Sequence, residues 1–140
     1  MSSENRTDER IKLANGLTVH FQRRSREIAG DRRQVQLAIR IPIEVEEIYF
    51  DDLDNPREAY QAYTSTVGKT VYFQVERVRN FVDLKEVQEA LETLKKEFLR
   101  ANLDYISMPS FARRFVLKSF HEWQEQKRLK EIYSQHISST

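Results

Sequence analysis

One stretch of this chain constrains its fold more than any other, because large aliphatic side chains occupy every second position in it. They are Val35, Leu37, Ile39, Ile41, Ile43 and Val45. A period of two is typical of a β-strand that has one buried and one solvent-exposed face. Proline has no N–H to donate to a neighbouring strand, so Pro42 predicts an edge or a break in the pairing there. The sequence therefore predicts a strand over residues 34–45 in a half-exposed sheet.

A β-hairpin is predicted upstream of this strand, around the Asn-Gly pair at residues 15–16. A two-residue loop would pair Leu13 with Thr18 and so mix apolar and polar side chains on one face. A three-residue loop over residues 14–16 pairs Leu13 with Leu17 and keeps the apolar side chains together. We expect this second register, with the glycine in a left-handed conformation.

Three helices and one more strand are predicted further along the chain. Asn55-Pro56 is a helix start, and Gly68 is the corresponding stop. A strand over residues 70–78 comes next, and a second helix begins at Asp83 with apolar residues at steps of three and four. The last helix is expected to run from Ser110 to about Ile137.

These elements predict an α+β fold. The expected architecture is an antiparallel sheet of about four strands, in the order β-β-β-α-β-α-α, with helices packed mainly on one face. Residues 1–10 are polar and are expected to be a disordered lead-in. A single domain is expected over residues 11–140, since a chain of this length suits one hydrophobic core.

Composition excludes several kinds of chemistry. The sequence contains no cysteine, which rules out disulfides, thiolate zinc sites, iron–sulfur clusters and cysteine nucleophiles. No apolar run is long enough for a signal peptide or a membrane span, so we expect a cytoplasmic protein that does not bind membranes. The formal net charge of +1 argues against a general polyanion binder but leaves room for a local basic patch.

No catalytic or metal-binding motif is present. The three histidines are scattered, and the motifs HExxH, GxSxG, GxGxxG and the phosphate loop are all missing from the sequence. Acidic residues crowd positions 44–58, but their spacing does not match a calcium loop, and a solvated acidic loop is expected. We therefore expect a non-enzymatic protein without metal or cofactor, and an enzyme whose groups meet only in the fold is the alternative.

The last predicted helix suggests a function. It would be about 40 Å long, against roughly 37 Å for the diameter of a compact domain of this size. Its apolar residues, among them Phe111, Phe115, Val116 and Phe120, are expected to share one broad face. We predict a protein–protein interaction module, with a second copy of the chain as the simplest partner, that uses Trp123, Leu129, Ile132, Tyr133 and Ile137. The alternative is a break near residues 124–127 that lets the helix fold back on its own sheet.

A segment rich in arginine gives the second hypothesis. Residues 23–33 are expected to form a loop that binds nucleic acid or another anionic ligand through arginine–phosphate contacts. The proposed anion-binding residues are Arg23, Arg24, Arg26, Arg32 and Arg33, helped by Arg114 and Lys118. For the segment itself we favour the simpler interpretation, a solvated hairpin tip with internal ion pairs. Tyr72 could stack on a base, but with three helices available we expect it to be buried.

Overall fold

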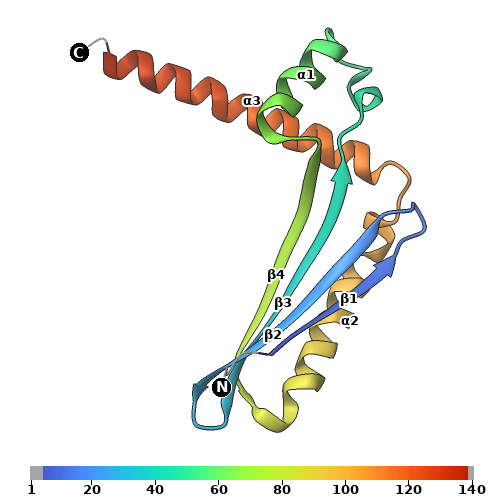
Figure 1. The fold of residues 1–140 in the computed structure, drawn as a ribbon, viewed down its shortest axis with the longest axis vertical. Coiled ribbons are helices and arrows are strands. Elements are labelled where there is room, and N and C mark those ends of the chain that lie inside the picture. The colour runs from blue at the N-terminus through green and yellow to red at the C-terminus, as the bar shows by residue number, and fades with distance from the viewer. Residues whose placement is uncertain (1–4, 139–140) are drawn as a thin grey trace. The chain divides into compact units, whose positions relative to one another are not determined.

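The structure, a computed structural model, describes residues 5–138 and contains one four-stranded antiparallel sheet (Figure 1). Its strands lie in the order β1-β2-β3-β4, and they are β1 (Asn5–Lys12), β2 (Thr18–Ala29), β3 (Arg32–Glu44) and β4 (Thr70–Asp83). The helices are α1 (Pro56–Val67), α2 (Val87–Ile106) and α3 (Phe111–Ser138), with short 3-10 helices η1 (Glu47–Phe50) and η2 (Leu84–Glu86). The predicted α+β class and element order are confirmed.

The chain divides into two compact units, which are considered separately below. Unit 1 comprises Met1–Pro42 and Tyr72–Pro109, and therefore holds most of the sheet together with α2. Unit 2 comprises Ile43–Val71 and Ser110–Thr140, and holds η1, α1 and α3. The expectation of one domain over residues 11–140 stays a prediction.

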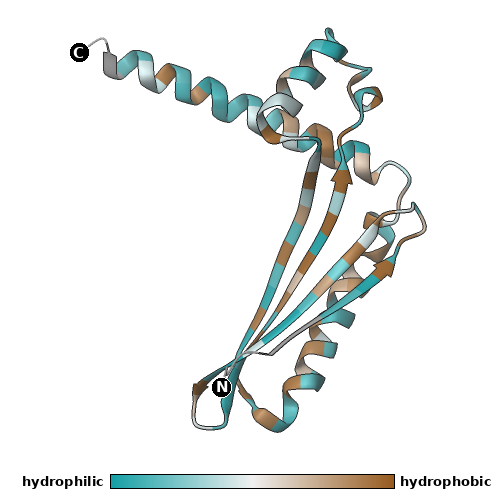
Figure 2. Cartoon of the chain, viewed as in Figure 1, coloured by the Kyte–Doolittle hydropathy of each residue, from teal (hydrophilic) through white to brown (hydrophobic). Residues whose placement is uncertain are grey.

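The core of unit 1 lies between the sheet and α2. Alternate residues of β3 are buried from Val35 onward, as the sequence pattern predicts, and Figure 2 shows the alternation along the strands. On the α2 side, Phe98 packs edge-on against Phe21 of β2, with ring centroids 6.2 Å apart. Fully burying a side chain of this kind stabilises a fold by roughly 1.5–3 kcal/mol. Within unit 1, no described element covers the other face of the sheet.

The predicted hairpin register is confirmed. The Leu13 N–H donates to the Leu17 carbonyl at 2.7 Å, and Ile11 lies opposite Val19. Gly16 has φ 91°, the left-handed conformation that a three-residue loop requires of it. The Asn15 side chain completes the loop, because its amide donates to the carbonyls at the end of α2 and just beyond it, of Ile106 and Met108.

Pro42 also behaves as predicted. Pairing between β2 and β3 extends from Ala29 opposite Arg32 to His20 opposite Arg40, and β3 continues past that point. Pro42 therefore lies where β3 has no partner on its β2 side, so its missing N–H costs no ladder bond there.

Two expectations for the N-terminal half differ from the structure. Residues 5–10, expected to be disordered, form most of β1, since β2 extends far enough to pair with them from Ser25 opposite Asn5 onward. The first four residues of the expected lead-in lie outside the described part. Residues 23–33, expected to be a loop, are the end of β2, the two-residue turn at Gly30–Asp31 and the start of β3. These segments lack an apolar alternation, and their strand character comes from backbone pairing, of β1 with β2 and of β2 with β1 and β3.

Unit 2 is built on two helices whose starts were predicted. Asn55 precedes α1, Pro56 is its first residue, and Gly68 ends it with φ 95°. The last helix, α3, runs without a break through residues 124–127. The alternative of a break there is therefore not adopted, and the last turns of α3 extend beyond α1 (Figure 1).

Candidate functional site

The first half of α3 is held by an aromatic cluster within unit 2. Phe120 packs edge-on against Phe50 of η1, with ring centroids 5.2 Å apart, and against Tyr63 of α1 at 5.6 Å. Trp123 packs on the same tyrosine, with centroids 5.4 Å apart. Burial raises the pKa of the Tyr63 phenol above its ordinary value. Trp123, proposed as an interaction residue, is thus half-buried in the packed face of α3.

The second half of α3 presents apolar side chains on its other side. Leu129, Ile132 and Tyr133 are 52%, 49% and 68% exposed, whereas Phe120 is 2% exposed. An α-helix turns about 100° per residue, so Leu129, nine residues after Phe120, lies about half a turn away. The expectation that all these residues share one broad face is therefore wrong. The fifth proposed residue, Ile137, lies in α3, and its side chain is outside the described part.

We call the exposed residues Leu129, Ile132, Tyr133 and His136 the α3 stripe. Their spacing of three, four and seven residues places them along one side of the helix. All four belong to the last turns of α3, which extend beyond α1 (Figure 1). Leu129 and Ile132 keep about half of their surface exposed.

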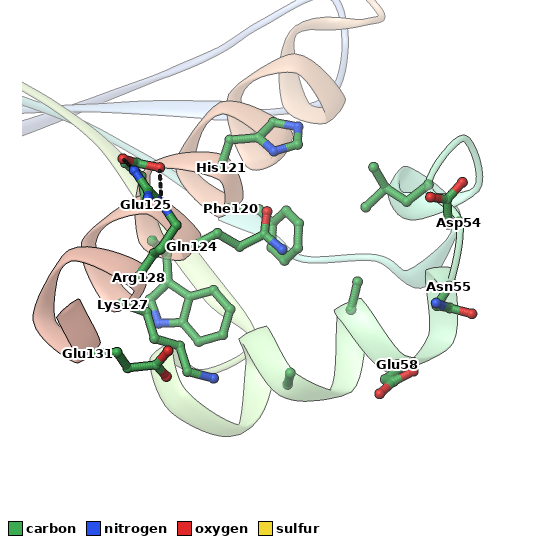
Figure 3. A pocket seen from close by; sticks show the side chains of 14 residues that line it. Asp54, Asn55, Glu58, Phe120, His121, Gln124, Glu125, Lys127, Arg128 and Glu131 are labelled. Atoms are coloured by element: carbon green, nitrogen blue, oxygen red, sulfur yellow. Dashed lines mark hydrogen bonds and ion pairs between the residues drawn. The ribbon is translucent and has the colours of Figure 1, made fainter. Parts of the chain in front are cut away.

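A groove of about 860 Å³ lies between α1 and α3, and no sequence pattern predicted it. Figure 3 shows Asp54, Asn55 and Glu58 on one wall and side chains of α3, including Lys127 and Arg128, on the other. The remaining lining residues are Leu53, Ala59, Ala62, Phe120, His121, Trp123, Gln124, Glu125 and Glu131. Charged side chains of both signs line the groove.

Two contacts organise the basic side of this groove. The Lys127 ammonium lies 5.4 Å from the centroid of the Trp123 ring, within the range of a cation–π contact. The Arg128 guanidinium donates to Glu125 at 2.6 and 3.2 Å. This hydrogen bond is the main reason that the pKa of the Glu125 carboxyl lies below its usual value. Both cations are thus engaged by side chains of α3 itself.

The arginine-rich segment does not form one cluster, because its side chains divide between the two faces of the hairpin. Arg23 lies on the α2 side, where its guanidinium contacts Glu92 at 2.7 Å and Glu9 at 3.4 Å. The hydrogen bond from Arg23 is the largest cause of the lowered pKa of Glu92. Lys95 contacts the same Glu9 carboxylate at 2.6 Å. Arg23 is therefore part of an ion-pair network on the covered face.

The other arginines of the segment also have partners inside unit 1. Arg26 donates from Nε to the Gln34 side chain at 2.9 Å, and Arg33 donates to the Ser25 hydroxyl at 3.3 Å. Arg32 lies 3.8 Å from Asp83, beside the point where the Leu84 N–H donates to the Asp31 carbonyl. Arg24 lies opposite Gln36 on the open face. Arg114 and Lys118 are exposed residues of α3, in unit 2.

The acidic residues of positions 44–58 spread out in the structure. Glu44 accepts a hydrogen bond from the Thr70 hydroxyl at 2.9 Å, and Asp52 forms an ion pair with Arg113 of α3. Over residues 5–138, no group of three His, Asp or Glu side chains is arranged to hold a metal ion.

Tyr72 departs from its expected burial. It is 40% exposed on the open face of the sheet, and the Arg40 guanidinium carbon lies 3.7 Å from the centroid of its ring. Of the three helices predicted to cover it, α2 alone belongs to the same unit as Tyr72, since α1 and α3 belong to unit 2.

None of the described helices combines the length and the apolar character that crossing a membrane requires.

Comparison with known proteins identifies no relative of this chain. No protein-family model matches the chain, and no match was found among curated proteins or solved structures.

Proposed function

We propose that this chain is a non-enzymatic protein–protein interaction module that self-associates through the α3 stripe. The observation that carries the proposal is the half-turn offset between the two apolar sides of α3. Leu129 and Ile132 point away from the side of α3 that packs on α1. A longer or shifted α1 on that same side of α3 would therefore not cover them. A second helix laid along the stripe would cover them.

A second copy of the chain is the partner that we favour. Isologous pairing, in which the same patch of two copies meets, is the commonest arrangement of soluble oligomers. A stripe at positions i, i+3, i+4 and i+7 is also the spacing at which two helices pack side by side. Three half-exposed apolar side chains make a small patch, so the expected dimer is weak and depends on concentration.

Sedimentation equilibrium over a range of loading concentrations tests this proposal. We expect the full chain to dimerise reversibly and the Ile132→Glu variant to stay monomeric, because pairing would bury the new carboxylates of both copies against apolar groups. Ser134→Glu is the matched control, since it adds the same charge about 200° round the helix from Ile132. A full chain that stays monomeric at the highest concentration, or a dimer that survives Ile132→Glu, would refute self-association.

Ile132→Glu is a better probe than a change at Trp123. Trp123 packs on Tyr63 and Phe120, so replacing it would disturb the folding of unit 2 together with any interface. Ile132 has half its surface exposed, and a polar replacement there leaves the aromatic cluster intact.

The alternative function, anion binding by residues 23–33, receives less support as a single site. Its arginines point to both faces of a hairpin, and Arg23 is already engaged by two carboxylates. The cytoplasm remains the compartment that we expect for the protein.

A further inference from the structure

The open face of the sheet in unit 1 carries a row of cationic and aromatic side chains that runs across all four strands. Arg10 of β1 lies directly opposite His20 of β2, and His20 lies directly opposite Arg40 of β3. Directly opposed residues of an antiparallel pair share a face. Arg40 in turn stacks on Tyr72 of β4, with its guanidinium carbon 3.7 Å from the ring centroid. We call these four residues the cross-strand row.

This face is opposite to the packed one. His20 stands between Val19 and Phe21, both fully buried, so its side chain and those of the cross-strand row point away from α2. The basic and acidic side chains are also distributed unequally between the two faces of the sheet. Among the described side chains, the register places Arg10, Lys12, Arg24, Arg26 and Arg40 on the open face, and the strand alternation places the acids Asp8 and Glu76 there. The carboxylates Glu9 and Glu92 lie instead on the α2 side, with Arg23 and Lys95.

We propose that this open face binds single-stranded nucleic acid, with the cross-strand row as the centre of the site. Arginine forms strong, often bidentate, hydrogen bonds with phosphate oxygens. Arg10 and Arg40 lie two strand spacings apart, about 10 Å, so they contact separate phosphates of one strand. The stacked pair of Arg40 and Tyr72 offers flat surfaces on which an unpaired base stacks.

A duplex fits this surface less well than a single strand. The major groove of B-DNA is about 12 Å wide and admits a helix or a two-stranded ribbon. Four strands with three spacings of about 4.8 Å span roughly 14 Å before side chains are counted. The face is therefore too broad to enter the groove, whereas a single strand with splayed bases lies across it.

Fluorescence anisotropy with labelled single strands of about 12 nucleotides, in both RNA and DNA form, tests the proposal. We expect binding at low ionic strength that weakens with salt, with a slope of log K against log salt of about −0.7 for each phosphate contacted. The double variant Arg10→Gln, Arg40→Gln should flatten this slope by about 1.4. Comparing the RNA and DNA strands shows whether the 2′-hydroxyl contributes.

The matched control removes two positive charges from the other side of unit 1. Lys96 and Arg100 are exposed residues of α2, and the double variant Lys96→Gln, Arg100→Gln changes the net charge by the same amount. We expect this variant to bind like the wild type. Equal loss in the two double variants would overturn the proposal, because it would mean attraction by net charge alone. Thermal unfolding of each variant verifies that it is folded.

Two further comparisons isolate base stacking. Tyr72→Leu should weaken binding by at least about fivefold, while Tyr72→Phe should keep the affinity, since stacking needs the ring and not the hydroxyl. An abasic strand should bind less tightly than the normal one. Equal binding of the abasic strand, or of a duplex, would overturn the assignment to single-stranded nucleic acid, as would the absence of binding at low salt. Repeating the titrations with Ile132→Glu separates this site from self-association.

Discussion

The middle of α3, residues 116–123, and its last turns differ in which side of the helix they use. In the first half, Val116 and Phe120 are buried and Trp123 packs on α1, so unit 2 is stabilised by contacts within itself. In the second half, Leu129 lies about 180° and Ile132 about 120° round the helix from Phe120, and both side chains stay half-exposed. The polar run from Gln124 to Arg128 separates the two patterns. The comparison teaches that the phase of an apolar pattern, and not its apolar content, decides what it packs against.

Phe120→Ala should have the largest effect on this comparison. The variant removes a ring that is 2% exposed and contacts both Phe50 and Tyr63, so we expect a loss of about 3–5 kcal/mol in the stability of unit 2. Denaturant unfolding followed by fluorescence measures it, because Trp123 is the single tryptophan and lies in the same cluster. Leu129→Ala, nine residues on, should change the stability by less than about 0.5 kcal/mol. Similar losses in both variants would contradict the offset between the halves.

Lys127→Gln should have a smaller effect, at the point where the two halves meet. It removes the ammonium 5.4 Å from the Trp123 ring, a contact of the kind that contributes about 0.5–1 kcal/mol at an exposed site. The same unfolding measurement detects the change, and Lys130→Gln on the next turn serves as the control. An unchanged midpoint in Lys127→Gln would show that this cation–π contact adds nothing to the packed half.

Arg128→Gln should leave stability unchanged and alter a titration instead. Its hydrogen bonds to Glu125 hold the pKa of that carboxyl below its ordinary value, so the substitution should raise that pKa. Because the folded pKa lies below the unfolded one, any contribution of the pair is present at neutral pH and disappears as the pH falls through the folded pKa. NMR titration of the glutamate carboxyls measures the change. A Glu125 pKa that does not move would argue against the ion pair.

Much of the fold could be predicted because apolar residues specify it directly. The apolar alternation from Val35 to Val45 was enough to predict strand β3. The apolar match of Leu13 with Leu17 was enough to predict the hairpin register. The strand character of residues 23–29 could not be predicted, since arginines and a serine carry no period-two apolar signal there. The strand character depends on backbone pairing with β1 and β3. A local sequence pattern does not report pairing with residues elsewhere in the chain.

The candidate surfaces were predictable only in part. Leu129, Ile132 and Tyr133 were identified from their position in a long helix, but their offset from Phe120 requires counting residues round the helix. The cross-strand row needs the register between strands, which the sequence settled for the first hairpin alone. Arg10 lay in a segment expected to be disordered, so its alignment with His20 and Arg40 had no local signal.

The interleaving of the two units has a consequence for how the chain is made. Each unit is assembled from two stretches of sequence that alternate along the polypeptide. During synthesis, all segments of unit 1 are available once Pro109 has emerged. In unit 2, Phe50 and Tyr63 cannot pack on Phe120 and Trp123 until those later residues have been made. A nascent chain therefore carries an uncovered aromatic surface for the time needed to add some sixty residues, several seconds at about 5–20 residues per second. During that interval the exposed aromatic surface would be a binding site for a chaperone.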